Sequence, residues 1–233
     1  MSLLENQVEI AHPQQPHCAV VLLLDRSDSM AGEKLKQLND GLMFLVKDIL
    51  SNDIARKRVD LSIISFGEQV QLLQDFTAVD ERLELSITEA NGATPMGEAI
   101  MLAADKIEER KKQYKAMGTN YYRPWIFMIT DGEPTDIKPG ELAWNNVIQT
   151  VHNGEINKKF LFFCVAVEPA NTQILKQIAP PNRPPLRLTP GMFKECFLWL
   201  SKSIQRVSVE RIGNQVALED PGKYGMTMTI PTD

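Results

Sequence analysis

The amino-acid sequence predicts an α/β fold: a Rossmann-like, doubly wound, mostly parallel sheet with helices on both faces and one antiparallel edge strand. Apolar runs of strand length alternate along the chain with stretches of helical periodicity, which favours right-handed crossover connections. The runs are continuously apolar, as expected of parallel strands that are buried on both faces. We predict buried strands at residues 19–24, 59–66, 125–129 and 160–167.

Three amphipathic helices are predicted, because apolar residues recur at steps of three and four positions. For the last of them, Thr189 is expected to be the N-cap and Pro190 to lie in the first turn. The apolar faces of the three helices consist of Leu35, Leu38, Leu42, Leu45 and Ile49; of Ile100, Ala103, Ala104 and Ile107; and of Phe193, Phe197, Leu200 and Ile204.

Two further strands are predicted at the edges of the sheet. Residues 67–76 are expected to form a hairpin with the second strand and so to run antiparallel to it. Residues 186–188 are bracketed by prolines and are expected to form a short edge strand, since proline cannot donate to a sheet hydrogen bond. We divide the chain into an N-terminal extension (1–17), one domain (18–208) and a C-terminal tail (209–233) of undefined structure.

The composition is ordinary for a globular protein, with 43% hydrophobic and 24% charged residues in a chain of 233. A formal net charge of −5 argues against nucleic-acid binding, and no apolar run is long enough to cross a membrane. Cys18, Cys164 and Cys196 lack paired spacing and are interpreted as reduced core thiols. Because no signal peptide is recognised at the N-terminus, the expected location is the cytoplasm.

Polar side chains gather at three places where predicted strands end or helices begin. Asp25, Ser27 and Ser29 follow the first strand, Thr94 precedes the second helix, and Asp131 follows the Trp125 strand. Loops that leave the carboxyl ends of parallel strands converge on one edge of the sheet. We therefore expect these five side chains to meet in one crevice.

The five side chains are two carboxylates and three hydroxyls, which are hard oxygen donors that suit Mg²⁺, Mn²⁺ or Ca²⁺ rather than zinc or copper. Mg²⁺ is the expected ion. Alternation along the chain lets Asp25, Ser27 and Ser29 share a face and turns Asp28 away from it. Helix capping is the competing interpretation for each residue alone, and for Thr94 in particular, but it does not explain the convergence of all five.

This combination resembles the metal-ion-dependent adhesion site of von Willebrand factor A (VWA) domains: D-x-S-x-S, a threonine within residues 92–97, and an aspartate in Thr-Asp-Gly. Residues 122–125 and 130–136 further resemble the bacterial tellurium-resistance TerY-like (YegL-like) branch. The resemblance implies that Ser27, Ser29 and Thr94 ligate the ion through their hydroxyls, and that Asp25 and Asp131 act directly or through water. It also implies an open coordination position for the Asp or Glu of a partner protein.

We expect a metal-dependent protein-interaction module and no enzymatic activity. The resemblance implies that its partners are tellurium-resistance, kinase or phosphatase components. A metal-dependent phosphatase-like hydrolase is one alternative, weakened because position 27 is serine and no histidine lies near the motifs. A scaffold with a purely stabilising metal is another. The sequence does not define the oligomeric state. Asp136 is expected to cap the helix that follows it, and Glu133 to be a solvated loop charge.

Overall fold

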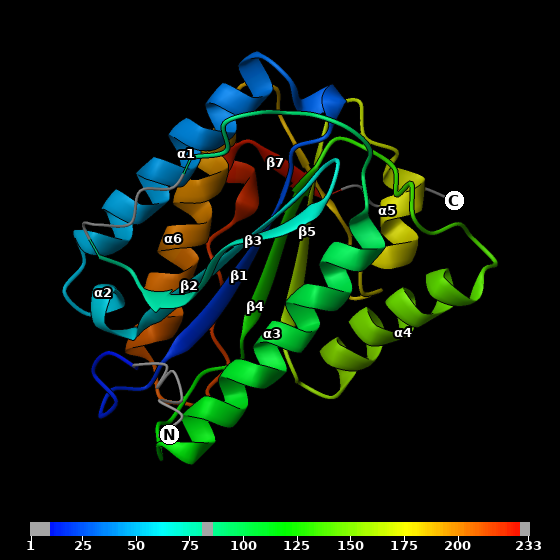
Figure 1. The fold of residues 1–233 in the computed structure, drawn as a ribbon. Coiled ribbons are helices and arrows are strands. Elements are labelled where there is room, and N and C mark those ends of the chain that lie inside the picture. The colour runs from blue at the N-terminus through cyan, green and yellow to red at the C-terminus, as the bar shows by residue number, and fades with distance from the viewer. Residues whose placement is uncertain (1–9, 81–85, 229–233) are drawn as a thin grey trace, which may run out of the picture.

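The computed structural model describes residues 10–80 and 86–228, and within them forms one seven-stranded sheet between two helical layers (Figure 1). The strand order is β3-β2-β1-β4-β5-β6-β7. The strands are β1 (Cys18–Asp25), β2 (Val59–Phe66), β3 (Val70–Ala78), β4 (Trp125–Thr130), β5 (Leu161–Val167), β6 (Leu186–Leu188) and β7 (Met226–Met228). The helices are α1 (Glu33–Leu50), α2 (Ala55–Arg58), α3 (Met96–Ala116), α4 (Leu142–Ile156), α5 (Thr172–Ile178) and α6 (Phe193–Val209), with short 3-10 turns η1 (Asp28–Met30) and η2 (Pro221–Tyr224).

The sheet confirms the predicted doubly wound α/β class. Strands β2, β1, β4, β5 and β6 are parallel, and β3 pairs antiparallel with β2 at one edge, as its hairpin pattern predicts. The prediction that residues 186–188 form an edge strand is wrong, because β7 pairs antiparallel with β6 on its outer side. Proline does not prevent this pairing, since the flanking prolines lie outside the three paired residues.

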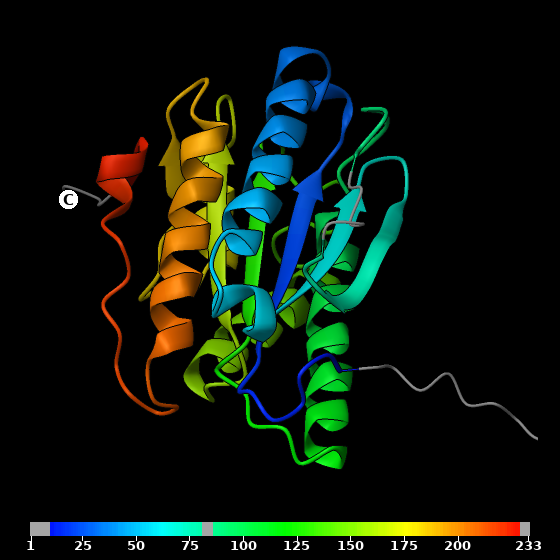
Figure 2. The same ribbon diagram turned by 90° about the vertical axis from the view of Figure 1, so that its left-hand side faces the viewer.

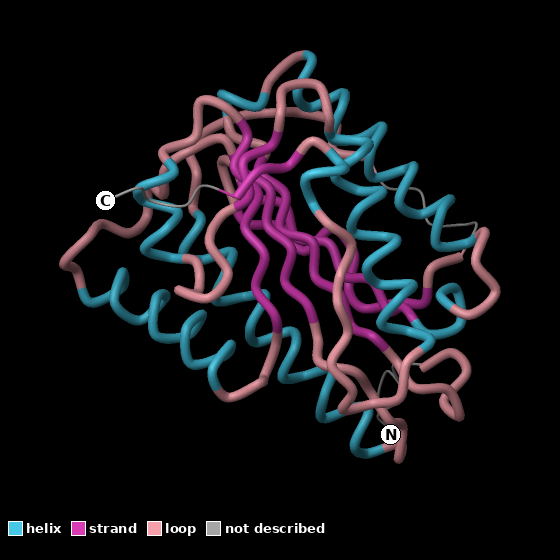
Figure 3. Tube along the Cα trace, turned by 180° about the vertical axis from the view of Figure 1, so that it is seen from behind, coloured by secondary structure: helices cyan, strands magenta, loops and turns pink. Residues whose placement is uncertain are grey.

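The two faces of the sheet bury separate hydrophobic clusters. Alternate residues of β1 point to opposite sides: Leu22 joins the cluster beneath α1 and α6, whereas Leu23 joins the cluster beneath α3, α4 and α5. Figures 1 and 2 show α1 and α6 side by side on one face, and Figure 3 shows the strands running between the helical layers. This double coverage is the reason the strands read as continuous apolar runs.

The start of α6 differs from its prediction. The helix begins at Phe193 with Met192 in the N-cap position, and Thr189 contributes its carbonyl, which accepts a hydrogen bond from Met192 N–H at 3.1 Å. The segment Thr189–Pro190 thus forms a turn before the helix instead of its first residues. The apolar face predicted for this helix is confirmed, because Phe193, Phe197 and the rest of the set are buried.

Residues beyond α6 fold back along the domain as far as they are described. Trp199 Nε1 donates to Glu219 O at 2.8 Å, and Met226 in β7 is fully buried. Near the N-terminus, Ile10 is buried in the cluster beneath α3. The first nine residues of the expected extension and the last five of the expected tail lie outside the described part. Among the described helices, none combines the length and apolar character that a membrane crossing requires.

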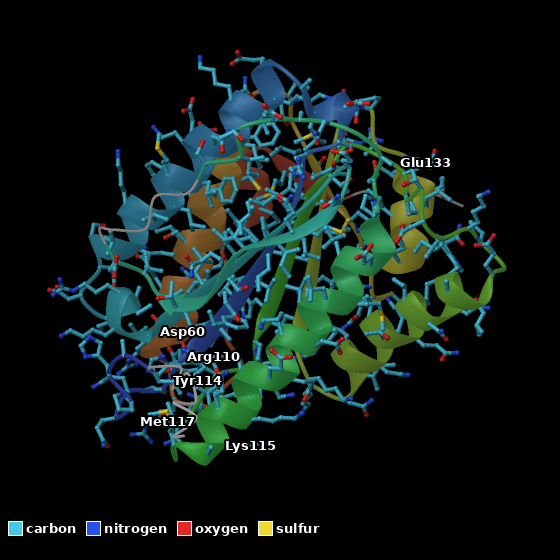
Figure 4. The ribbon with its side chains drawn as sticks, viewed as in Figure 1. Asp60, Arg110, Tyr114, Lys115, Met117 and Glu133 are labelled. Atoms are coloured by element: carbon cyan, nitrogen blue, oxygen red, sulfur yellow. The ribbon has the colours of Figure 1, made fainter. Side chains whose placement is uncertain are left out.

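A buried polar cluster, here called the Asp60 cluster, joins four side chains where the sheet's amino ends meet α3: His17, Asp60, Arg110 and Tyr114. Asp60 Oδ2 accepts hydrogen bonds from His17 Nδ1 at 3.0 Å, Arg110 Nη2 at 2.8 Å and Tyr114 Oη at 2.5 Å. Figure 4 shows Asp60, Arg110 and Tyr114 close together, far from Glu133 at the other end of the sheet. The cluster ties β2, α3 and the segment before β1 to one another.

Candidate metal centre at the carboxyl edge of the sheet

The ends of β1 and β4 bring the predicted residues to one place. These strands are parallel neighbours, with Leu24 paired to Ile129, so Asp25 at the end of β1 lies beside Thr130 at the end of β4. Thr130 Oγ1 donates to Asp25 Oδ2 at 2.5 Å. The geometry expected from parallel strands is therefore present at this edge.

A chain of hydrogen bonds connects the loop after β1 to the loop after β4. The Oγ atoms of Ser27 and Ser29 lie 3.1 Å apart, and Ser29 Oγ donates to Asp131 Oδ1 at 2.6 Å. Asp25 Oδ1 accepts from Ser27 N–H at 2.8 Å, which turns the loop at the strand end. Four of the five predicted residues thus belong to one continuous network.

Thr94, the fifth residue, approaches the network over Gly132. A Cβ atom built on Gly132 would lie 3.0 Å from Thr94 Oγ1 and 3.6 Å from Asp25 Oδ2, so both oxygens face the glycine. Thr94 is held by the loop after β4, because its N–H donates to Thr135 Oγ1 and its carbonyl accepts from Thr135 N–H, both at 3.0 Å. A side chain at position 132 would fill the space these oxygens share.

The capping interpretation of Thr94 is not supported, because its side chain makes no cap hydrogen bond to α3. That function belongs to Asp136, whose carboxylate accepts from Gly97 N–H at 3.1 Å and Glu98 N–H at 2.8 Å. The expectation that Asp136 caps the helix after it is wrong. The loop after β4 folds back over the start of α3, which sequence order alone does not reveal.

The neighbouring charged side chains hold the loops. Asp28 Oδ1 accepts from Gly92 N–H at 2.9 Å, so it points away from the network, as the alternation predicts. Arg26 Nη1 donates to Asn91 Oδ1 at 2.7 Å. Glu133 is exposed as expected, and it also accepts from Asn171 Nδ2 at 2.7 Å, which links the loop after β4 to the start of α5.

The carboxylates of the centre are buried. Asp25 is 0% exposed and Asp131 3%, whereas Ser29 is exposed. Burial raises the pKa of Asp25 above its ordinary value, and the negative charge of Asp131 raises it further, although hydrogen bonds from Ser27 and Thr130 act in the opposite direction. Two buried carboxylates in mutual repulsion form an environment in which a cation is favoured.

Lys34, in the first turn of α1, is a charged member of the centre that sequence reasoning missed. Its Nζ forms an ion pair with Asp131 Oδ2 and also donates to Ser29 O at 3.1 Å. A lysine on a helix is not an oxygen donor and does not follow a strand, so the pattern of candidate ligands does not include it. A signal was nevertheless present, because Lys34 stands five residues after Ser29, close enough to return to the same loop.

The donor set fits a hard divalent cation. It offers carboxylate and hydroxyl oxygens from three segments, a space at Gly132 that a Cβ would fill, and a positive group already drawn to Asp131. In residues 10–80 and 86–228, no group of three or more His, Cys, Asp or Glu side chains is arranged to hold a metal. An ion at this edge would therefore depend on the hydroxyls as well as on the two aspartates.

The sheet order and the oxygen-rich loops at its carboxyl edge define a doubly wound α/β domain with a candidate cation centre. The family model of the von Willebrand factor type A domain matches residues 19–194, most of the chain, and the chain belongs to this family.

Relatives and solved structures agree with this assignment. The chain is 28% identical over 153 residues to inter-alpha-trypsin inhibitor heavy chain 4 of Mus musculus, an alignment that covers 63% of this chain and 15% of that protein. It thus spans a small part of the length of the curated relatives it matches. Two solved structures share the fold: a von Willebrand factor type A protein from Catenulispora acidiphila (TM-score 0.62, 15% identity, covering 82% of this chain and 43% of that one), and the vWF domain of the type V pili tip protein Mfa5 from Porphyromonas gingivalis (TM-score 0.60, 13% identity, covering 87% and 99%).

Proposed function

We propose that this chain is a metal-dependent protein-interaction module, in which Asp25, Ser27, Ser29, Thr94 and Asp131 hold a divalent cation, with Mg²⁺ as the expected ion. The observation that carries the proposal is the hydrogen-bonded network from Ser27 through Ser29 to Asp131, which joins oxygen donors 102 residues apart in the chain at a buried carboxylate pair. Membership in the VWA family supports the same interpretation.

The five residues would contribute to ion binding in two different ways. The hydroxyls of Ser27, Ser29 and Thr94 are neutral donors, and the buried carboxylates of Asp25 and Asp131 supply the balancing negative charge. When bound, the ion offers an electrophilic coordination position to an Asp or Glu of a partner protein. Ser29 is the exposed member of the set and lies where such a partner would approach.

A finer assignment is also proposed, to the TerY-like branch of bacterial tellurium-resistance and stress-response proteins. It is supported by the resemblance of residues 122–125 and 130–136 to that branch. Partners would then be other tellurium-resistance proteins or kinase and phosphatase components. A cytoplasmic location is proposed with it, and is supported by Cys18, Cys164 and Cys196, which are buried and free.

An interaction module is favoured over a phosphatase-like hydrolase by the placement of the histidines. His17 is bound to Asp60 in the Asp60 cluster, and His152 Nε2 lies 3.0 Å from Ala179 O beside α4. His12 lies beside His17, because its carbonyl oxygen is 3.2 Å from His17 Nε2. None of these three histidines is placed at the candidate metal centre as a general base. A scaffold with a purely stabilising metal is distinguished from an interaction module by experiment.

The first test is calorimetric titration of Mg²⁺ and Mn²⁺ into the wild type and into Thr94→Ala, Asp131→Ala and Gly132→Ala. We expect each variant to bind at least about tenfold more weakly, since each removes a donor or fills the space between donors. Ser51→Ala is the matched control, because its hydroxyl lies after α1 and donates to Asp48 O, away from the centre. Equal binding by all four variants and the wild type would rule out the centre.

The second test separates interaction from scaffolding. The wild type and Thr94→Ala would be used as bait in a bacterial lysate containing Mg²⁺, with and without EDTA, while circular dichroism monitors the fold. An interaction module predicts a partner that EDTA and Thr94→Ala both release from an intact fold. A stabilising metal predicts that EDTA lowers the melting temperature but leaves capture unchanged.

A further inference from the structure

Lys34 occupies an unusual place for a cationic side chain, against a carboxylate of the candidate metal centre. Its Nζ contacts Asp131 Oδ2 while the other carboxylate oxygen, Oδ1, accepts from Ser29 Oγ. The Asp131 side chain is 0% exposed, whereas that of Lys34 is 30% exposed. One partner is therefore fixed in the interior and the other is attached by a flexible stem that reaches water.

We propose that Lys34 is a tethered counter-ion that competes with a divalent cation for Asp131, and thereby sets the ion concentration at which the centre fills. This inference rests on the proposed function, and it adds a residue that lies outside the oxygen donor set. Without a bound ion, the ammonium group of Lys34 neutralises the buried carboxylate of Asp131. When a divalent cation binds at Asp131, the two positive charges repel each other, which favours displacement of Lys34.

The geometry provides a place for the displaced ammonium. Besides Asp131, Lys34 Nζ donates to the backbone carbonyl of Ser29, an acceptor that does not belong to a side chain of the centre. The ammonium group has three N–H donors and sits on a flexible four-carbon stem, so it can release Asp131 and keep its hydrogen bond to the Ser29 carbonyl. Displacement thus requires a change of side-chain rotamer and no movement of the backbone of α1.

Competition has two measurable consequences of opposite sign. Removal of the Lys34 charge should tighten binding of the ion, by roughly three- to tenfold for an ion pair of which only the lysine is partly exposed. The same removal should lower the melting temperature of the metal-free protein, because Asp131 loses its counter-ion. At saturating ion concentration the two melting temperatures should approach each other, since the ion replaces the lost charge.

The experiment is a calorimetric titration of Mn²⁺ and of Mg²⁺ into the wild type, Lys34→Met and Lys34→Gln, with melting curves recorded in EDTA and in saturating ion. Lys36→Met is the matched control, because it removes the same charge from the same turn of α1 at an exposed position. We expect both Lys34 variants to bind more tightly than the wild type and Lys36→Met to bind like the wild type.

The possible failures are distinct. Equal affinity of the wild type and both Lys34 variants would overturn the competition and leave the metal centre standing. Weaker binding by the Lys34 variants would also overturn it, since Lys34 would then support the ion. If none of the four proteins binds Mn²⁺ or Mg²⁺, this inference and the proposed metal centre both fail. Binding by the Lys34 variants alone would support the competition in its strongest form.

Discussion

The Asp60 cluster makes a sharp prediction for stability. Asp60→Ala removes the acceptor shared by His17, Arg110 and Tyr114, and leaves the Arg110 guanidinium buried with Gln113 Oε1 as a remaining acceptor. The side chains of Asp60 and Arg110 are both 0% exposed. Asp60→Ala should therefore leave an uncompensated charge in the protein interior.

The magnitude follows from that burial. Breaking a buried ion pair by removing one partner costs about 3–5 kcal/mol of unfolding free energy, which corresponds to a fall of roughly 10 °C in melting temperature for a protein of this size. Replacing both partners by apolar residues avoids the orphaned charge. The double variant Asp60→Leu with Arg110→Met should therefore be less destabilised than Asp60→Ala alone. Asp60 Oδ1 has no hydrogen-bond partner among the described residues, which adds to the cost of burying the native carboxylate.

The assay is urea unfolding of the wild type, Asp60→Ala, Asp60→Leu, Arg110→Met and the double variant Asp60→Leu with Arg110→Met, followed by far-UV circular dichroism. Asp53→Ala is the matched control, because Asp53 pairs with Arg56 at the surface and is 88% exposed. Its removal should change the unfolding free energy by no more than about 0.5 kcal/mol. The reasoning is refuted if Asp60→Ala costs less than about 1 kcal/mol, or if the double variant loses as much unfolding free energy as Asp60→Leu and Arg110→Met lose together.

Three further predictions concern pH, packing and thiol chemistry. Burial alone would raise the pKa of Asp60, but hydrogen bonding to His17 and the charge of Arg110 hold this pKa below the ordinary 3.8. The contribution of ionised Asp60 to the unfolding free energy is therefore complete above pH 3.8 and is lost as pH falls through the lower folded-state pKa. The gap in unfolding free energy between the wild type and Asp60→Asn should narrow below about pH 4 in urea titrations, and a constant gap would contradict this. Gly154→Ala should cost about 1–3 kcal/mol in thermal melts, because its Cβ would lie 2.2 Å from Cζ of the buried Phe160, and a stabilised variant would disprove that clash. Burial raises the pKa of Cys18 and Cys164 to about 12, so iodoacetamide at pH 8 should label the native protein far more slowly than the urea-unfolded protein, and equal rates would show that the thiols are accessible.

Much of the fold is readable from the sequence because its signals are local. Residues 59–66 form the predicted strand without change, and α1 buries the predicted stripe from Leu35 to Ile49. A strand buried on both faces needs apolar residues along its whole length, and a helix packed on a sheet needs apolar residues every three or four positions. Both patterns lie within a single element, so they can be recognised without knowing which elements pack against it.

The structure departs from the sequence predictions where the decisive contact joins distant parts of the chain. Residues 226–228, Met-Thr-Met, form too short a segment to predict a strand, and they become one because β6 offers an unpaired edge. Asp136 caps α3 across the loop after β4, although Asp before a helix ordinarily predicts a cap for the helix that follows. In both cases the pairing partner is set by spatial proximity and has no local pattern.

The sequence by itself predicted the central parallel strands, the three amphipathic helices and the VWA resemblance. It also placed the candidate oxygen donors together, because parallel strands must deliver Asp25 and Asp131 to the same edge. The tertiary structure alone decided which charges those donors meet: Lys34 at Asp131, and Arg110 with His17 at Asp60. The physical reason is that a long side chain pairs with whichever charged or polar group the folded backbone brings within its reach in a buried place. The position of a residue in the sequence, even within a clear periodic pattern, does not specify that partner.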